Sequence, residues 1–363
     1  MIYIAWFILF FTLLQFLVAT ANLIFLQRFP KINQNSNQLV SVLIPARNEE
    51  KNIAGLLNDL QIQEFENIEI IVFNDQSTDQ TETIVNGFVE KDRRIKLIKS
   101  DGLPEGWLGK NHACHNLAKH AKGKYFLFLD ADVSVGKNII LQTLALSERH
   151  KLGLLSIFPM QIMKTIGEKI SVPNMNYILL SLLPLILVRK TSFPSIAAAN
   201  GQFMLFNAEV YKKMEPHEKL KNSKVEDIEI ARYFKQNKIK VACLTGTPSI
   251  TCHMYSDVRE AIQGFSKNVI MFFGSSFVMA ILFWLITTFG FIVILSSFSP
   301  LIFWIFLVII FVTRAIISVV SKQPVFQNIL LIVPQQIILG IFIYQAFINK
   351  FKKQHIWKDR KIS

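Results

Sequence analysis

Phe126-Leu127-Phe128-Leu129-Asp130-Ala131-Asp132 is the stretch that decides the fold, because an apolar run ends abruptly there in two acids. The apolar run predicts a strand whose burial delivers both carboxylates to the edge of a sheet. If the strand continued, Asp130 and Asp132 would point the same way, since side chains alternate along a strand. Such a pair can hold Mg²⁺ or Mn²⁺ while phosphate oxygens fill the other metal positions. Two acids in a turn after a strand are also commonplace without any function.

The region around this stretch alternates short β-branched runs with helix-length amphipathic segments. That alternation predicts β-α-β units around a largely parallel sheet, an α/β fold. The expected strands are Val40–Ile44, Ile68–Asn74, Ile95–Ile98 and Tyr125–Leu129. Ligands in open α/β sheets lie beyond the carboxyl ends of the strands, so residues 45–48, 75–79 and 130–132 should converge on one site.

A second predicted strand is also followed by acidic residues. The stretch is Ile70-Ile71-Val72-Phe73-Asn74-Asp75-Gln76-Ser77-Thr78-Asp79. A carboxylate at the strand end can accept a hydrogen bond from a base or a ribose, and we assign this role to Asp75. Thr78 or Asp79 can instead cap the following helix. Asn48 is expected to cap the helix after the first strand, ahead of acids that suit its first turn.

Together with Val42-Leu43-Ile44-Pro45-Ala46-Arg47-Asn48-Glu49-Glu50, these motifs resemble the family 2 glycosyltransferases of the GT-A fold. The motifs, including Gly109-Lys110 before a helix, occur in the family's order over roughly residues 38 to 270. The resemblance implies a Rossmann-like domain that binds a nucleotide-diphospho-sugar. The residues that it places around the nucleotide-sugar are Pro45, Ala46, Glu49, Asp75, Lys110 and Asp130, and it makes Asp132, with Asp130, the metal ligand.

The acidic run Val225-Glu226-Asp227-Ile228-Glu229 opens a predicted helix that ends near residue 237. A carboxylate at a helix N-terminus is kept ionised by the helix dipole and can take a proton from an attacking acceptor oxygen. In the family, the second acid is the usual base, which assigns Asp227 as the catalytic base beside Glu226. A plain acidic first turn of a helix would look the same.

Ala199-Asn200-Gly201-Gln202-Phe203-Met204 resembles the family's small-residue loop near the donor sugar and the acceptor. Gly201 allows close backbone approach there, and Gln202 follows it. Farther on, Gln263-Gly264-Phe265-Ser266-Lys267-Asn268 stands where processive synthases carry Gln-x-x-Arg-Trp, but the Arg and Trp are absent. This departure favours transfer of a single hexose over polysaccharide synthesis.

The chain has 363 residues, 51% of them hydrophobic, and the apolar excess lies at its two ends. Residues 1–27 carry no charged side chain and are long enough to span a bilayer, so we expect a signal anchor. A cleaved signal peptide is the alternative. Further apolar segments run over 269–296, 301–320 and 326–348, and we expect domains 1–27 (anchor), 28–268 (GT-A), 269–348 (membrane segments) and 349–363 (basic tail).

The net charge is +13, and much of it lies beside apolar segments rather than on a basic helix with interleaved aromatics. Anionic lipid headgroups therefore fit better than nucleic acid. If all three C-terminal segments crossed, the basic tail would face outside, against the positive-inside tendency. We therefore expect 326–348, which Pro334 interrupts, to be re-entrant or interfacial. Three cysteines without C-x-x-C spacing favour a reducing compartment, which agrees with a catalytic domain facing the cytoplasm from the cell membrane.

Gly106-Trp107-Leu108-Gly109-Lys110-Asn111-His112-Ala113-Cys114 and the terminal spans look like the carotenoid glycosyltransferase subgroup and its hopene-associated relatives. The resemblance implies an inverting hexosyltransferase that uses a UDP-sugar, UDP-glucose first, and a divalent metal. The acceptor would be a membrane lipid such as a carotenoid acid or another polyisoprenoid. A polyprenyl-phosphate glycosyltransferase shares the donor site, and Arg189 and Lys190 would serve its phosphate. The alternative from a different functional class is a membrane adaptor that binds a nucleotide-sugar without transferring the sugar.

Overall fold

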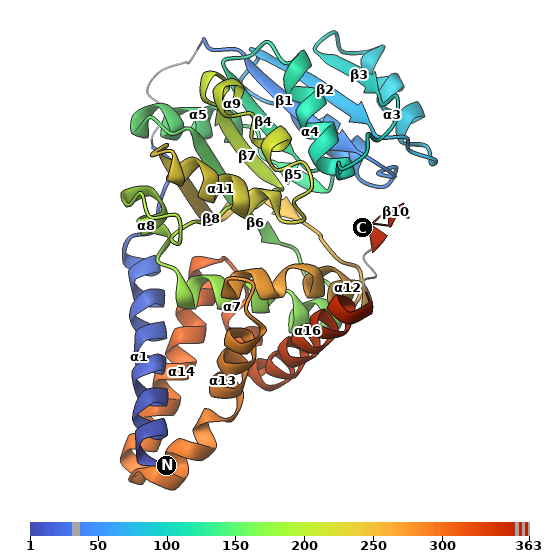
Figure 1. The fold of residues 1–363 in the computed structure, drawn as a ribbon. Coiled ribbons are helices and arrows are strands. Elements are labelled where there is room, and N and C mark those ends of the chain that lie inside the picture. The colour runs from blue at the N-terminus through green and yellow to red at the C-terminus, as the bar shows by residue number, and fades with distance from the viewer. Residues whose placement is uncertain (31–36, 353–355, 358–359, 362–363) are drawn as a thin grey trace. The chain divides into compact units, whose positions relative to one another are not determined.

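The computed structural model describes residues 1–30, 37–352, 356–357 and 360–361, and its chain folds into two units (Figure 1). One unit comprises Met1–Leu26, Gln161–Pro184 and His253–Ser363 and is mostly helical. The other comprises Gln27–Met160 and Leu185–Cys252 and contains the large sheet. We call them the membrane unit and the sheet unit.

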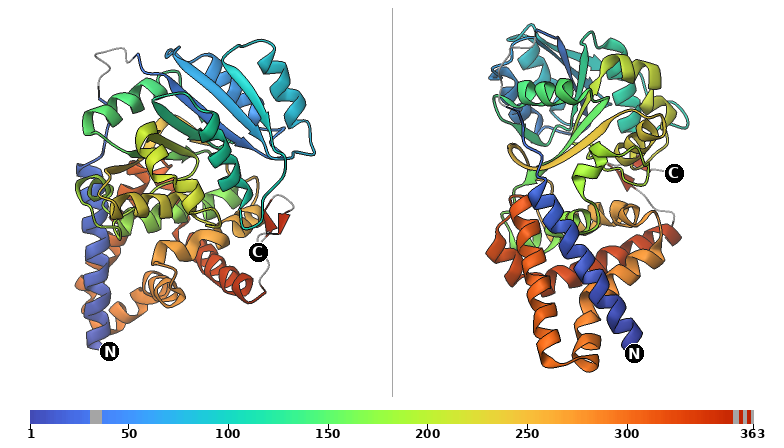
Figure 2. Two further views of the ribbon diagram at one scale, coloured as in Figure 1. Left: turned by 45° about the horizontal axis from the view of Figure 1, so that its top comes forward. Right: turned by 90° about the vertical axis from the view of Figure 1, so that its left-hand side faces the viewer.

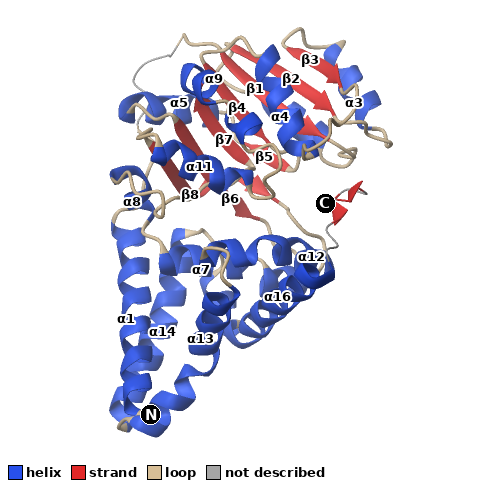
Figure 3. Cartoon of the chain, viewed as in Figure 1, coloured by secondary structure: helices blue, strands red, loops and turns tan. Residues whose placement is uncertain are grey.

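In the described residues, the sheet unit is built on eight strands in the order β3-β2-β1-β4-β7-β6-β8-β5. β1, β2, β3 and β4 pair in parallel, whereas β7 runs antiparallel to both β4 and β6. Figure 3 shows the twisted sheet with helices against its faces. The strands are β1 Val40–Ala46, β2 Ile68–Asn74, β3 Ile95–Lys99, β4 Tyr125–Leu129, β5 Val133–Val135, β6 Leu154–Gln161, β7 Phe203–Asn207 and β8 Val241–Cys252.

The core of the sheet is apolar because its central strands are covered by helices. Every residue of β2 and of β4 is buried, as expected for strands of a parallel sheet covered on both faces. The helices of this unit are α2 Ile53–Gln61, α3 Thr81–Val89, α4 Gly109–His120, α5 Ile139–His150, α8 Leu185–Lys190, α9 Ala208–Met214, α10 Pro216–Lys219 and α11 Glu226–Gln236.

The predicted α/β sheet and its first four strands are confirmed to within two residues at each end. The predicted cap at Asn48 is wrong. α2 begins only at Ile53, and Asn48 instead adopts a left-handed backbone with φ of 53°. Its side-chain oxygen accepts a hydrogen bond from the Thr78 N–H at 2.9 Å. Asn tolerates this conformation better than most residues, so Asn48 ties two loops together rather than starting a helix.

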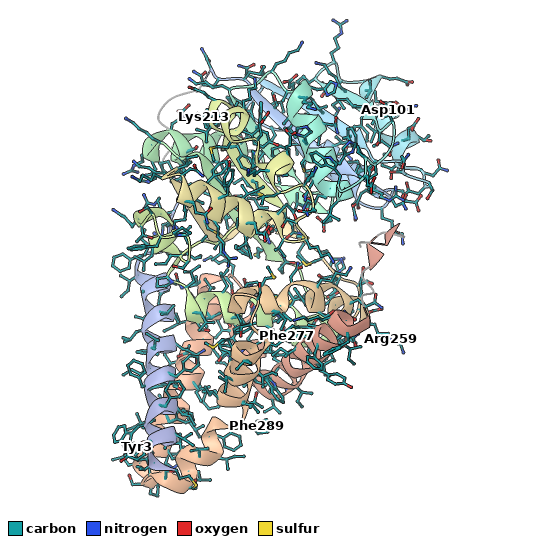
Figure 4. All side chains as sticks on the ribbon, viewed as in Figure 1. Tyr3, Asp101, Lys213, Arg259, Phe277 and Phe289 are labelled. Carbon is teal, nitrogen blue, oxygen red and sulfur yellow. The ribbon has the colours of Figure 1, made fainter. Side chains whose placement is uncertain are left out.

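Among the residues that the structure describes, the membrane unit contains four helices that are long and apolar enough to cross a bilayer. Three of them pack lengthwise on one another: α1 Ile2–Ile24, α13 Phe277–Ser297 and α14 Pro300–Val320. Ala5 and Ile8 of α1 are buried against Ile294 and Phe306, so the start of α1 lies beside the turn between α13 and α14. Figure 4 shows Tyr3 and Phe289 toward that end, and both side chains are exposed, as expected for side chains that face lipid.

The remaining elements of the membrane unit are shorter, except α16. They are α6 Ile166–Ser171, α7 Pro173–Leu182, α12 Val258–Asn268, the 3₁₀ turn η1 Val269–Phe273, α15 Val325–Leu330, α16 Ile332–Lys352, β9 Ile356–Trp357 and β10 Arg360–Lys361. The apolar run 269–296 is not one helix, because Gly274 has φ of 63° and Ser276 caps a new helix by accepting the Met279 N–H. The turn separates η1 from α13.

The start of α16 contacts α6, and its end contacts α12. Gln335 near its start donates to the Lys169 carbonyl of α6 at 3.0 Å, and Asn349 near its end donates to Ser266 of α12 at 3.3 Å. α6 and α12 contact each other, and His253 pairs with Glu168 at 2.9 Å beside them. The two further views show α16 crossing α13 obliquely instead of lying lengthwise along the α1–α14 pair (Figure 2).

The predicted domain boundaries stay predictions, although the contact-based units interleave more than those boundaries do. Residues 161–184 and 253–268 fold with the membrane unit, whereas the prediction included them in the catalytic domain. Of the basic tail, Lys353 and Lys358 lie outside the described residues, as does Lys31 after the first apolar segment.

Candidate active site

Strand pairing brings the loop before β7 beside the acids that follow β4. Leu129, the last residue of β4, is opposite Phe203, the first residue of β7. The Asp130 N–H donates to the Gln202 carbonyl at 3.2 Å, which continues the ladder past the strand ends. Gly201 and Gln202 therefore lie next to Asp130 and Asp132, although they are about 70 residues apart in sequence.

Lys110 joins the end of β4 to the first turn of α11. Its Nζ lies 2.8 and 2.9 Å from the two carboxylate oxygens of Asp130 and 3.4 Å from Glu226 Oε1. Lys110 reaches this place because it is in the first turn of α4. Burial by itself lowers the pKa of Lys110, but Asp130 and Glu226 outweigh it and hold the pKa well above its usual value. Lys110 is thus a permanent cation between two acids.

Asp227 is oriented by two backbone donors. Its Oδ2 accepts the Gly201 N–H at 3.0 Å and its Oδ1 accepts the Ile228 N–H at 2.8 Å. Burial, and then the neighbouring charge of Glu226, raise the pKa of Asp227 to about 7, although these hydrogen bonds and Lys110 act against the rise. A carboxylate whose pKa lies near neutrality can accept a proton and release it again, which a general base must do.

Gly201 lies close to the charged ends of Lys110 and Glu226. A Cβ built on it would lie 2.9 Å from Lys110 Nζ and 3.4 Å from Glu226 Oε1. The loop therefore passes close enough for its backbone N–H to reach Asp227. The sequence prediction of a close backbone approach at this glycine is consistent with that geometry.

Asp132 is a half-buried carboxylate with weak partners. The Gln202 amide lies 3.4 Å from both of its oxygens, and the Cys252 thiol lies 3.6 Å from Oδ2. Burial, followed by the charges of Asp130 and Glu49, raises the pKa of Asp132 to about 6. Negative charge is therefore concentrated around Asp132 beyond what Lys110 neutralises, and a cation would relieve it.

The donor set around Asp132 fits Mg²⁺ or Mn²⁺ held partly by a substrate. Both ions take oxygen ligands, and Mg²⁺ at phosphate sites is held by one or two carboxylates plus phosphate oxygens. Within the described residues, no group of three or more His, Cys, Asp or Glu side chains could hold a metal by itself. Asp130 is occupied by Lys110, so Asp132 is the carboxylate that is more available for a metal.

The loops after β1 and β2 are held together next to this cluster. Arg47 donates to the carbonyls of Asp75 and Gln76 at 2.6 and 3.0 Å, and the Asp75 N–H donates to the Ala46 carbonyl at 2.8 Å. Asp79 accepts from the Glu50 and Thr81 N–H groups, each at 3.0 Å, so its role is to join the loops. Pro45 and Ala46 end β1, and the buried Asp75 directly follows β2.

The structure thus brings Glu49, Lys110, Asp130, Asp132, Gly201, Gln202, Glu226 and Asp227 into one cluster, while Pro45, Ala46 and Asp75 lie at the ends of neighbouring strands. Sequence reasoning missed Cys252, which lies at the end of β8 and accepts the Gln202 amide at 2.9 Å. It also missed Arg47. A lone cysteine in an apolar strand and an arginine in a loop carry no local signal of a site. The individual roles of all these residues stay predictions.

A parallel sheet that turns antiparallel at β7, with acids after β4 and at the start of α11, defines a class of protein. That class is defined by its fold, which is the GT-A fold. The fold agrees with a solved structure of a mannosyltransferase from Pyrobaculum calidifontis in complex with GDP-mannose and Mn²⁺. The two chains align with a TM-score of 0.59 at 15% identity over 96% of this chain and 99% of the other, which supports the fold alone.

Residues 41–215 match the sequence model described as glycosyl transferase family 2. Over these residues the chain is similar to this family, and it has relatives that are carotenoid glycosyltransferases. The 4,4'-diaponeurosporenoate glycosyltransferase of Staphylococcus haemolyticus is 26% identical over 69% of this chain and 67% of the relative. Its counterpart from Staphylococcus aureus is 27% identical over 64% of this chain and 61% of the relative. The resemblance found in the motifs is therefore confirmed at the level of the family and the carotenoid subgroup.

Proposed function

We propose that this protein transfers a single hexose from a UDP-sugar, UDP-glucose first, to a hydrophobic lipid acceptor such as a carotenoid acid. The observation that carries the proposal is the cluster in which Lys110 links Asp130 to Glu226, next to Asp227. A protein that only binds nucleotide-sugar has no need of a second pair of acids held opposite the first. The two carotenoid glycosyltransferases among the relatives favour a polyisoprenoid acid as the acceptor.

In the proposed reaction, Asp227 orients the acceptor oxygen toward the anomeric carbon of the sugar. With an alcohol acceptor, Asp227 also takes the hydroxyl proton, for which a pKa of about 7 is suited. A carboxylic acid acceptor is already ionised near neutral pH, so Asp227 would then mainly orient it. The Gly201 N–H keeps the Asp227 carboxylate in place during this step.

At the donor side, Asp132, with Asp130, would hold a divalent metal. When bound, that metal supplies Lewis-acid stabilisation of the leaving diphosphate. Lys110 holds Asp130 in position, and Asp75 is the proposed contact of the uracil. The mannosyltransferase of the same fold was solved with Mn²⁺ and GDP-mannose, so GDP-mannose belongs in any donor panel.

The second candidate is a polyprenyl-phosphate glycosyltransferase, for which Arg189 and Lys190 were expected to bind the phosphate. In the structure, Arg189 Nε donates to Gln27 Oε1 at 2.9 Å and its Nη1 contacts the His150 ring. Gln27 in turn donates to the Cys243 carbonyl at 2.9 Å. Arg189 is thus engaged with the body of the sheet unit, which leaves the exposed Lys190 as the weaker basis for this alternative.

We also propose that α1, α13 and α14 cross the cell membrane, while both ends of α16 stay on the cytoplasmic side. The start of α1 and the α13–α14 turn lie at one end of the bundle. Both ends of α16 instead contact α6 and α12. This arrangement places the basic tail on the cytoplasmic side, in agreement with the positive-inside tendency.

The test is transfer of radiolabel from a panel of UDP-sugars and GDP-mannose into organic-extractable lipid, using membranes that contain the full chain. Carotenoid acids and polyprenyl phosphates are offered in parallel. Label in the carotenoid ester supports the proposal, and label only in polyprenyl phosphate supports the second candidate. Label found only in polymer would indicate a synthase, and nucleotide binding without any transfer would indicate an adaptor.

A further inference from the structure

α14 carries an arginine inside an otherwise apolar helix that is long enough to cross a membrane. Arg314 is 4% exposed, and none of the other residues of α14 is charged. A guanidinium stays protonated under all physiological conditions. Ionisable residues within membrane segments are rare, and they pair with an opposite charge or face a functional site. The partners of Arg314 therefore decide what it does.

The neighbours of Arg314 are aromatic and neutral. Its guanidinium carbon lies 3.4 Å from the centre of the Tyr177 ring of α7, and Nη1 donates to Gln335 Oε1 of α16 at 3.4 Å. Nη2 is buried and has no hydrogen-bond partner. In the described part of the chain, no carboxylate forms an ion pair with Arg314. The buried acid of this unit, Glu168, is already paired with His253.

Other polar side chains surround this cation. Gln335 donates to Asn328 Oδ1 at 3.2 Å, and Asn328 donates to Ser318 of α14 at 2.9 Å. Asn174 of α7 donates to the Gln335 carbonyl at 3.0 Å, and its own side-chain oxygen is buried without a partner. The cluster supplies hydrogen-bonding groups from α7, α14, α15 and α16, but no negative charge.

The level of Arg314 along α14 suits a lipid headgroup. It precedes Val320, the last residue of the helix, by six residues, which is about 9 Å at 1.5 Å per residue. This end of α14 is opposite the end that lies beside the start of α1. Arg314 is thus less than two helical turns from this end of α14, a depth at which a cation in a membrane helix can meet a lipid headgroup.

We propose that Arg314, together with Gln335 and Tyr177, binds the anionic head of a membrane lipid, a phosphate or a carboxylate. Nη2, which has no hydrogen-bond partner, and Nη1 form the planar pair of donors that can bind either a phosphate or a carboxylate. The Tyr177 ring, over which the guanidinium lies, keeps the guanidinium in its orientation. All three residues belong to the membrane unit.

The test uses the full chain in nanodiscs of phosphatidylcholine, with or without a minor fraction of phosphatidylglycerol or oleate. Lipid that remains with the protein after extraction is quantified by mass spectrometry. We expect selective retention of one anionic lipid, and about tenfold weaker retention in Arg314→Gln, the loss of one charge-assisted contact. Arg314→Lys should keep much of the lipid retention of the wild type. Arg259→Gln, which changes an exposed arginine of α12, is the matched control and should retain lipid like the wild type.

The identity of the retained lipid separates the two chemistries: phosphatidylglycerol indicates a phosphate head and oleate a carboxylate head. If Arg314→Gln does not fold, the lipid dependence of the wild-type melting temperature decides, because it needs no variant. A wild type that retains no anionic lipid, and that melts equally in all nanodiscs, would overturn the proposal. Stabilisation by inorganic phosphate alone, without lipid retention, would also overturn it.

Discussion

Two features of Asp227 have opposite effects on its pKa. They are its position at the start of α11 and its burial beside Glu226. The first favours its charge through two backbone hydrogen bonds, and the second disfavours it. The effect of burial is the larger of the two, so the pKa of Asp227 lies near neutrality instead of near the usual value of an aspartate. The pKa that suits the proposed role of Asp227 as a base therefore comes at the expense of folding stability at neutral pH.

We predict that Asp227→Asn lowers kcat by about 10²- to 10⁴-fold with an alcohol acceptor, because general base catalysis is worth this much. With a carboxylic acid acceptor, the loss should be smaller, since only orientation is affected. Glu229→Gln, in the same first turn of α11, is the matched control and should stay near wild type. Equal rates for wild type and Asp227→Asn with both kinds of acceptor would contradict the assignment.

The same residue predicts a pH dependence of stability. The folded-state pKa of Asp227 is raised from 3.8 to about 7, so the folded state holds this proton more tightly than the unfolded state does. The contribution of this proton to folding stability is fully present below about pH 4 and is lost as the pH rises through 7. Asp227→Asn should therefore melt higher than the wild type at pH 8, with no gain at pH 4. Thermal unfolding in detergent measures this, and an equal difference at both pH values would argue against a raised pKa.

At the residue scale, the sequence predicted Asp130, Asp132 and Asp227 because each begins or follows an element in a recognisable motif. It could not predict that Lys110 binds Asp130 and Glu226, because that contact depends on how α4 and α11 pack. Cys252 was missed for a related reason: its contacts with Gln202 and Asp132 arise only when β8 is placed in the sheet.

At the scale of elements, α13 and α16 approach most closely at a glycine. A Cβ on Gly340 would lie 2.7 Å from the Trp284 ring, and the Trp284 Nε1–H donates to the Gln336 carbonyl at 2.9 Å. Thr288 also donates to Gln336 Oε1 at 3.2 Å. The small residue thus sets the distance between the two helices, and the tryptophan fixes their register.

We predict that Gly340→Ala destabilises the protein by about 1–3 kcal/mol, because overpacking displaces Trp284 or separates the helices. Gly87→Ala in α3 is the matched control, since a Cβ added there would have no neighbour within 4 Å. That change should be neutral or stabilising by up to about 1 kcal/mol through helix propensity. The melting temperatures of both variants and of the wild type are measured in the same detergent. Equal shifts in melting temperature for Gly340→Ala and Gly87→Ala would show that the contact with Trp284 is unimportant.

Element boundaries were predictable where hydrophobicity alone determines them. The start and end of α14 follow its apolar run to within one residue. The run 269–296 was not divided in the prediction, because the turn at Gly274 depends on a backbone angle and not on polarity. Asn48 shows the same limit, since its side chain bonds across to Thr78 rather than along its own segment.

At the scale of the whole molecule, the number of crossings decides on which side the chain ends. α16 is apolar and long enough to cross by itself, but its contacts and the positive-inside tendency argue against a crossing. We predict that a cysteine at residue 298 or 299, in the α13–α14 turn, reacts with a membrane-impermeant thiol reagent in intact cells. A cysteine at Asn349 should react only after the cells are opened. Labelling of both positions in intact cells would mean that α16 crosses.

The central claim is that the acids after β4 and at the start of α11 form a metal-dependent site of sugar transfer to lipid. The most direct measurement is transfer of labelled sugar into organic-extractable lipid by membranes with the wild type or Asp132→Asn, with Mn²⁺ or with a chelator. The account predicts label that requires both the metal and Asp132, and a loss of the order of 10²-fold or more in the variant. Lipid labelling that persists in Asp132→Asn under chelation would contradict it.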